Sequence, residues 1–125
     1  MLSKNARIMI VDDMKMIRTS MRKYLNSIGY ENIIEAVDGE DALKQYAAQR
    51  PDFIFMDVVM PNVTGDEALK IIRDGDKKTP VVMLSSVAEK GIMESCKQQG
   101  ILCYLLKPLT AQTGPKILSD VLEKI

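Results

Sequence analysis

Four short apolar runs in this chain each stop at a polar or charged residue. Runs of this length, separated by longer amphipathic stretches, are typical of buried strands in a parallel sheet. The four runs cover residues 8–11, 53–56, 81–84 and 104–106. A fifth strand is expected over residues 33–36, where the signal is the weakest of the five.

Between these runs the apolar residues recur at the spacing of a helix face. Ile17, Met21, Tyr24 and Ile28 follow one another at i, i+4, i+7 and i+11, and the helix that they mark is expected to end near Gly29. Four further helices are expected: between Gly39 and Pro51, from near Gly65 to Gly75, around residues 92–96 and closed by Gly100, and over residues 117–125.

The resulting order alternates strand and helix through the whole chain. With right-handed crossovers, this order builds a parallel sheet covered by helices on both faces. Hydrophobic residues make up 46% of the chain and charged residues 27%, which is ordinary for a globular domain, and no repeat, linker or shift in composition divides it. We therefore predict a single α/β domain over residues 1–125.

Composition excludes several classes of function. The formal net charge is +0, and without a basic stripe the domain is not expected to bind nucleic acid directly. No apolar run is long enough for a membrane span and no signal-peptide core is present, so we expect a cytoplasmic protein without membrane insertion. Cys96 and Cys103 are interpreted as structural thiols. Because the chain contains no histidine, any phosphoryl group has to come from an outside donor.

The polar residues at the strand ends are the candidate site. Asp12-Asp13, Asp57, Ser85 and Lys107 each follow a predicted strand, and the ligand crevice of such a sheet lies outside the carboxyl ends of its strands. Each residue also has a structural interpretation, since an aspartate or serine caps helices and a lysine points into solvent. Caps alone do not require four of five strands to end in reactive groups, so the joint pattern favours a functional site.

Charge balance then predicts a metal ion. Three carboxylates against the single Lys107 leave the site negative, and an all-oxygen site of this kind selects a hard cation, best Mg²⁺. Adjacent Asp12 and Asp13 suit the metal, which leaves Asp57 as the nucleophile that would form an aspartyl-phosphate. The metal, the ammonium and the Ser85 hydroxyl would neutralise the transferring oxygens.

The ordered motifs resemble the receiver domain of two-component response regulators, the family that includes the single-domain chemotaxis regulator CheY. The matching segments are Val11-Asp12-Asp13, residues 36–39, residues 57–61 with Gly65, Ser85, and residues 104–108. The resemblance implies a flavodoxin-like doubly wound (βα)5 fold with a five-stranded parallel sheet in the order 2-1-3-4-5.

The resemblance also assigns roles to the site residues. It implies that Asp57 is the phosphoacceptor and that Asp12, Asp13, Asp57 and the backbone carbonyl of Val59 hold Mg²⁺. It implies further that Lys107 pairs with the phosphoryl oxygens and that the bond following it is cis.

Ser85 and Tyr104 would form a switch pair, in which the hydroxyl moves to the phosphoryl group and the ring rotates into the vacated space. Residues alone allow another interpretation of Tyr104, a half-buried strand aromatic with its hydroxyl in water.

The leading hypothesis is a signalling module rather than a turnover enzyme. A histidine kinase or phosphotransfer protein would phosphorylate Asp57 and bias a two-state surface, formed in the family by the fourth helix, fifth strand and fifth helix, where a downstream protein docks. A stand-alone CheY-like regulator is preferred over a receiver trimmed from a multidomain regulator such as a DNA-binding transcription factor. The competing hypotheses are a phosphatase with an aspartyl intermediate, a flavin-binding protein and a phosphorylation-independent scaffold.

Five positions depart from the family pattern. Leu109 stands where phenylalanine is usual, and Ser85 replaces the commoner threonine. Val59 and Val87 flank the path of a hydrolytic water and neither can orient it, so slow self-dephosphorylation is expected. Pro115 favours a short last helix that begins near the proline itself.

Overall fold

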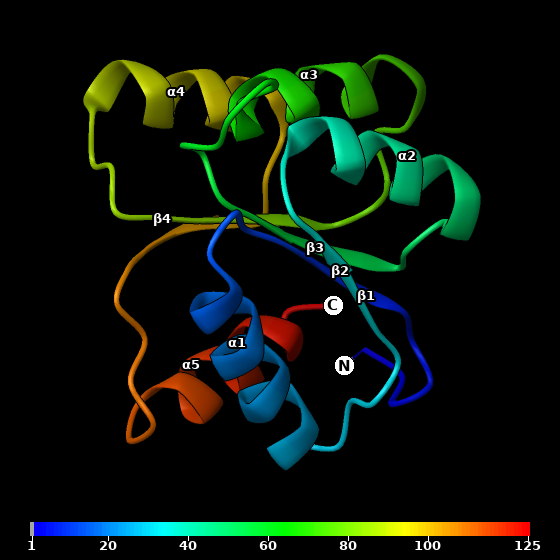
Figure 1. The fold of residues 1–125 in the computed structure, drawn as a ribbon, viewed down its shortest axis with the longest axis vertical. Helices are drawn as coiled ribbons and strands as arrows, with labels where there is room; N and C mark the ends of the chain where they lie inside the picture. The colour runs from blue at the N-terminus through cyan, green and yellow to red at the C-terminus, as the bar shows by residue number, and fades with distance from the viewer. Residues whose placement is uncertain (1) are drawn as a thin grey trace.

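The computed structural model describes residues 2–125 and contains all five expected strands and all five expected helices. The strands form one parallel sheet, which lies between two layers of helices (Figure 1). The strands run in the order β2-β1-β3-β4-β5, as expected. The elements are β1 (Ile8–Val11), α1 (Lys15–Ser27), β2 (Ile33–Ala36), α2 (Gly39–Gln49), β3 (Phe53–Met56), α3 (Gly65–Gly75), β4 (Val81–Ser85), α4 (Lys90–Gln99), β5 (Cys103–Leu106) and α5 (Gly114–Leu122).

The continuous apolar strands are explained by burial on both faces of the sheet. In β1, Ile8 and Ile10 belong to one core cluster, and Met9 and Val11 belong to another. The first cluster lies under α1 and α5 and the second under α2, α3 and α4, which cover opposite faces (Figure 1). A strand covered on both sides has no polar face, so its sequence is a continuous run of apolar residues instead of an alternation of apolar and polar residues.

The element ends differ from the expected ones by a few residues. Strand β4 extends to Ser85, so this serine closes the strand rather than following it. Helix α5 begins at Gly114, with Pro115 in its first turn, as expected for a proline at that position. It ends at Leu122, so the expectation that Ile125 continues the helix is wrong, and the Ile125 side chain is exposed.

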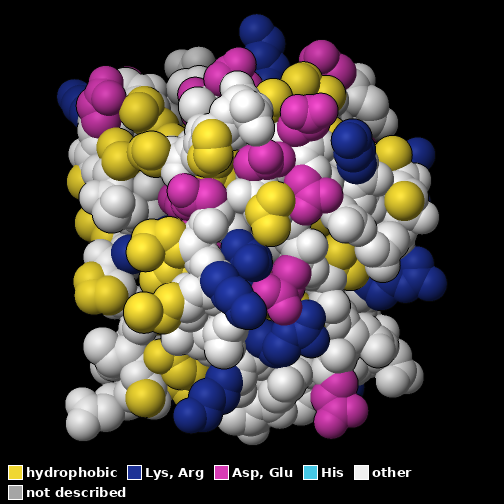
Figure 2. Space-filling view, viewed as in Figure 1, with side chains coloured by type: hydrophobic (Ala, Val, Ile, Leu, Met, Phe, Trp, Pro, Cys, Tyr) yellow, Lys and Arg dark blue, Asp and Glu magenta, His cyan; other side chains and the backbone are white. Residues whose placement is uncertain are grey.

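None of the helices within residues 2–125 has the length and apolar character that a membrane span requires. On the face shown in Figure 2, acidic side chains lie mostly in the upper half, and basic side chains gather below the centre with an acidic side chain beside them. The basic group does not extend across this face as the stripe expected for binding a polyanion would.

Candidate functional site

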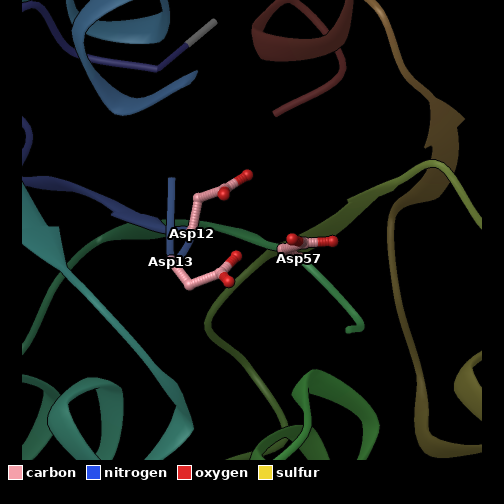
Figure 3. Close-up of side chains that lie close together, drawn as sticks. All are labelled: Asp12, Asp13 and Asp57. Atoms are coloured by element: carbon pink, nitrogen blue, oxygen red, sulfur yellow. The ribbon is translucent and has the colours of Figure 1, made fainter. Parts of the chain in front are cut away.

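The register of β1 and β3 brings the first acidic residues together. Val11 pairs with Met56, so Asp12 and Asp57 leave neighbouring strands at the same level. The backbone N–H of Asp57 donates to the Val11 carbonyl at 2.9 Å, which extends the ladder to the site. One carboxylate oxygen from each of Asp12, Asp13 and Asp57 lies within 4.8 Å of the others, and Figure 3 shows the three side chains gathered at this edge.

Lys107 reaches the same point from the end of β5. Its N–H donates to the Ser85 carbonyl at 2.9 Å, and its ammonium pairs with Asp12 and lies 3.1 Å from Oδ2 of Asp57. The Lys107 side chain is only 13% exposed, so the interpretation of a solvent-facing lysine is wrong. The Lys107–Pro108 peptide bond is cis, which confirms the expectation for this turn.

The electrostatics of the cluster indicate a deficit of positive charge. Burial raises the pKa of Asp57, Lys107 opposes the rise, and the neighbouring charge of Asp12 adds to it, so that the pKa ends above its usual value. Burial alone would lower the pKa of Lys107, but its hydrogen bond to Asp12 and the two carboxylate charges outweigh burial and raise it. One ammonium that stays protonated does not balance these carboxylates.

The residues present fit a magnesium ion. All side-chain donors of the cluster are carboxylate oxygens, two of the three side chains are buried, and Asp13 is exposed, so solvent has access to one side. Mg²⁺ prefers carboxylate oxygens and keeps several waters. Val59, whose backbone carbonyl is the fourth expected ligand, lies two residues beyond Asp57 in the loop after β3, with its side chain 57% exposed.

Ser85 does not cap α4, so that structural interpretation is wrong. The helix begins at Lys90, five residues after the last residue of β4, and no side chain caps it. The Ser85 hydroxyl accepts a hydrogen bond from the N–H of Val87 at 3.1 Å, and the serine is fully buried. Its oxygen is therefore held by a backbone amide at the same strand edge as Asp57.

Tyr104 lies inward rather than with its hydroxyl in water. The hydroxyl donates to the Val87 carbonyl at 2.5 Å, and the half-buried ring packs against the core cluster under α2, α3 and α4. Burial raises the pKa of Tyr104 above its usual value, so the hydroxyl remains a donor at neutral pH. The interpretation with a solvated hydroxyl is wrong for this structure.

Gly65 brings helix α3 into direct contact with the backbone of Asp57. Its N–H donates to the Val58 carbonyl at 2.8 Å, and a Cβ at Gly65 would lie 1.8 Å from the carbonyl oxygen of Asp57. No side chain fits in that space. Glycine at the first position of α3 therefore allows the backbone that carries Asp57 to pack against the helix.

Sequence reasoning missed one residue next to the cluster, Arg18. Its Nη1 donates to the backbone carbonyl of Asp12 at 2.7 Å, and its Nε donates to Glu35 at 3.1 Å. The signal in the sequence is a single acidic residue in the second predicted strand, together with two arginines four positions apart in the first predicted helix. Their common target is recognisable only once the strands are paired.

Comparison with known proteins agrees with this geometry. The family model for the response regulator receiver domain matches residues 8–119. Chemotaxis protein CheY-3 of Vibrio cholerae is 34% identical over 126 aligned residues, which cover 99% of this chain and 97% of that protein. Chemotaxis protein CheY of Pseudomonas aeruginosa is also 34% identical, over 95% of this chain and 94% of that protein.

Solved structures show the same fold. A chain of the CheX–CheY–BeF3–Mg complex from Borrelia burgdorferi superposes with a TM-score of 0.86 at 27% identity, covering 95% of this chain and 88% of that one. CheY4 of Vibrio cholerae gives a TM-score of 0.82 at 34% identity, covering 94% and 98%. With a family match over most of its length and relatives above 30% identity, this chain belongs to the response regulator receiver domain family.

Proposed function

We propose that residues 1–125 form one receiver domain that accepts a phosphoryl group on Asp57. The donor is a phosphohistidine of a histidine kinase or phosphotransfer protein, or a small phosphodonor. An Asp57 oxygen forms the new P–O bond while the bond from phosphorus to the donor breaks, and the donor leaves with that electron pair. The convergence of Asp12, Asp13, Asp57 and Lys107 at one edge of the sheet carries this proposal.

Each side chain has a separate task in this transfer. Asp57 is the nucleophile, and Asp12, Asp13 and Asp57, together with the Val59 carbonyl, are the residues that would hold Mg²⁺. When bound, the ion neutralises charge on the transferring oxygens and so favours attack by an anion. The Lys107 ammonium, already 3.1 Å from Asp57, pairs with another phosphoryl oxygen.

The output of the domain is a change in protein binding. The Ser85 hydroxyl turns from the Val87 amide to the phosphoryl group, and the loop after β4 shifts as a result. Tyr104 responds to this shift because its hydroxyl is bound to the Val87 carbonyl in that loop. We place the downstream partner at the face formed by α4, β5 and α5, where Leu106 presents an exposed apolar side chain. The protein thus acts by stoichiometric modification and contact, without catalytic turnover of a substrate.

Intact-mass measurement tests the proposal directly. The protein is incubated with acetyl phosphate and Mg²⁺, and we expect the mass of one phosphoryl group to be added per chain. Asp57→Asn should gain none, and wild type treated with a chelator should gain little. If wild type gains no phosphoryl group, or if Asp57→Asn gains as much, the proposed function is wrong.

The released phosphate separates a signalling module from an aspartyl phosphatase. We expect far fewer than one phosphate per chain per minute with common phosphomonoesters as substrates. Such esters need a general acid placed beside the nucleophile for their leaving group, and in our proposal Asp12 and Asp13 hold the metal ion while Lys107 pairs with a phosphoryl oxygen. Sustained release over many turnovers, lost in Asp57→Asn, would favour the phosphatase instead.

A further inference from the structure

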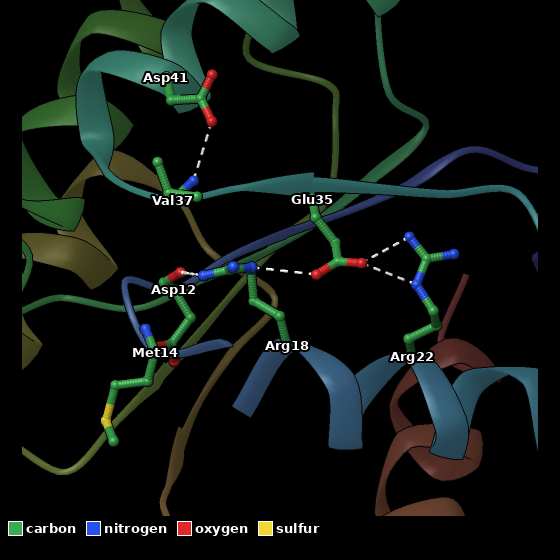
Figure 4. Close-up of polar contacts among 7 residues, drawn as sticks. All are labelled: Asp12, Met14, Arg18, Arg22, Glu35, Val37 and Asp41. Carbon is green, nitrogen blue, oxygen red and sulfur yellow. Dashed lines mark hydrogen bonds and ion pairs between the residues drawn. The ribbon is translucent and has the colours of Figure 1, made fainter. Parts of the chain in front are cut away.

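Two residues outside the acidic cluster hold its backbone in place. Arg18, in the first turns of α1, donates from Nη1 to the carbonyl of Asp12 at 2.7 Å and from Nε to Glu35 at 3.1 Å. Figure 4 shows the Arg18 side chain lying between the two acceptors, with Glu35 reaching down from β2. Its side chain is 11% exposed, so the guanidinium is largely removed from water.

The Asp12 residue is held from both sides. Its N–H donates to the Ala36 carbonyl of β2 at 3.1 Å, and its carbonyl accepts from Arg18. The Asp12 side chain is fixed as well, with Oδ1 accepting from the Met14 N–H at 2.9 Å and Oδ2 pairing with Lys107. Every polar atom of Asp12 therefore has a partner.

Asp13 has no such support of its own. Among the described residues its side chain makes no hydrogen bond or ion pair, and it is exposed. The peptide that joins Asp13 to Asp12 is planar, and its carbonyl is the atom that Arg18 binds. The bond therefore fixes the plane in which the N and Cα of Asp13 lie, which narrows the positions that its carboxylate can reach.

Glu35 keeps the arginine in this position. It accepts from Arg18 on one oxygen and from Arg22 on the other, at 3.1 and 2.8 Å, so one carboxylate links the edge strand to two turns of α1. A guanidinium that is bound on two sides has few alternative rotamers. The bond to Glu35 also keeps Arg18 paired, so the arginine does not compete for the carboxylates of the cluster.

We infer that Arg18, anchored by Glu35, is a positioning residue that pre-sets the Asp12–Asp13 peptide for binding a divalent cation. The inference rests on the proposed function and adds to it a residue that touches neither the carboxylate oxygens of the metal ligands nor the phosphoryl group. Partners of metal ligands typically affect metal affinity by 10–100-fold. Arg22 offers a matched comparison, because it shares the Glu35 carboxylate without contacting Asp12.

Magnesium titration followed by NMR of the Asp12 and Asp13 amides tests this role without phosphorylation. Arg18→Ala should weaken Mg²⁺ binding about tenfold, and Arg22→Ala should remain within twofold of wild type. The Mg²⁺ affinity of Arg18→Lys should lie between those of Arg18→Ala and Arg22→Ala, because a lysine can bind one of the two acceptors but not both. Glu35→Ala should weaken binding, and Arg18→Ala/Glu35→Ala should be no weaker than Arg18→Ala alone, since both act through one contact.

The outcomes distinguish this inference from the function on which it rests. If wild type itself binds no Mg²⁺, the proposed function fails and the inference fails with it. If wild type binds Mg²⁺ and folded Arg18→Ala binds within twofold, only the inference is overturned. Should Arg18→Ala not fold, Arg18→Lys and Glu35→Ala decide: wild-type affinity in both contradicts the positioning role.

Discussion

The hydroxyl of Tyr104 donates to the backbone carbonyl of Val87, the residue whose own N–H is bound to Ser85 Oγ. The two residues that the family resemblance assigns to the switch are therefore linked through a single residue of the loop after β4. A displacement of the serine hydroxyl frees the Val87 amide and changes the position of the carbonyl that holds Tyr104.

We expect Ser85→Ala to uncouple this loop from the phosphoacceptor. On phosphorylation with acetyl phosphate, the amide resonance of Val87 should move in wild type because its acceptor turns away. In Ser85→Ala the acceptor is already missing, so the phosphorylation-induced shift should fall by at least half. NMR spectra before and after phosphorylation measure it.

Ser86→Ala is the matched control, because Ser86 is the exposed neighbour of the buried serine. It should leave the Val87 shift intact. A shift in Ser85→Ala as large as in wild type would show that the serine hydroxyl does not hold the loop.

Self-dephosphorylation is expected to be slow in wild type and faster once polar groups flank the acceptor. Val59 is exposed two residues after Asp57, and Val87 follows Ser85 at the same spacing. Val59→Asn with Val87→Glu adds groups that orient a hydrolytic water, and a modest general-base contribution predicts at least about a tenfold shorter lifetime. The decay of the phosphorylated mass after removal of the phosphodonor measures it.

Ile71→Asn, at an exposed apolar position on α3, controls for the loss of surface hydrophobicity. Its phosphoryl lifetime should equal that of wild type. An unchanged or longer lifetime in the double variant contradicts the role given to the two valines.

Asp57→Asn is expected to stabilise the fold at neutral pH. Burial raises the pKa of Asp57 above its usual 3.8, so the ionised carboxylate is less favourable in the folded than in the unfolded chain. That cost is present above the folded-state pKa and disappears as the pH falls towards 3.8, where the group is protonated in both states. The melting temperature at pH 7 should therefore shift upwards by a few degrees.

The pH dependence identifies the cause. The difference in Tm between Asp57→Asn and wild type should be smaller at pH 4 than at pH 7, because protonation of Asp57 removes the cost, while Glu31→Gln, at an exposed loop position, should change little between the two pH values. If the increase in Tm of Asp57→Asn over wild type is the same at both pH values, the charge of the Asp57 carboxylate is not its cause.

The two ends of α3 predict opposite effects of the same substitution. Gly65→Ala places a Cβ 1.8 Å from the Asp57 carbonyl oxygen, so we expect the free energy of unfolding to fall by more than about 2 kcal/mol. At Gly75 a Cβ meets no atom within 4 Å, and alanine should leave stability unchanged or raise it by up to about 1 kcal/mol. Denaturant titration of both variants tests this, and equal effects would contradict the close approach.

The fold was predictable because its signals are local. A strand buried on both faces, such as β1, appears as an apolar run in any context, and proline and glycine mark the helix ends through their own backbone preferences. The expectation that Ile125 continues the last helix failed, because α5 ends at Leu122. The spacing of apolar residues implied a buried side chain at position 125, but Ile125 is exposed, so core packing does not extend the helix to this residue.

The candidate site was predictable in part, for a related reason. Asp12, Asp57 and Lys107 each follow a strand, so the sheet alone brings them together. The bond from Arg18 to the Asp12 carbonyl and the bond from Tyr104 to the Val87 carbonyl both end on the backbone. Every residue type has the same backbone carbonyl, so no pattern of side chains in the sequence predicts which carbonyl accepts these bonds.

The close packing of Gly65 against Asp57 makes the two sides of the proposed phosphoacceptor unequal. On the α3 side, backbone packs against backbone, and a Cβ at Gly65 would lie 1.8 Å from the Asp57 carbonyl oxygen. On the β4 side, the contacts are single hydrogen bonds that the Val87 N–H donates to Ser85 and the Tyr104 hydroxyl donates to the Val87 carbonyl. We therefore expect a phosphoryl group on Asp57 to displace the loop after β4 rather than helix α3, so that one missing methyl group determines on which side of the domain the structure changes.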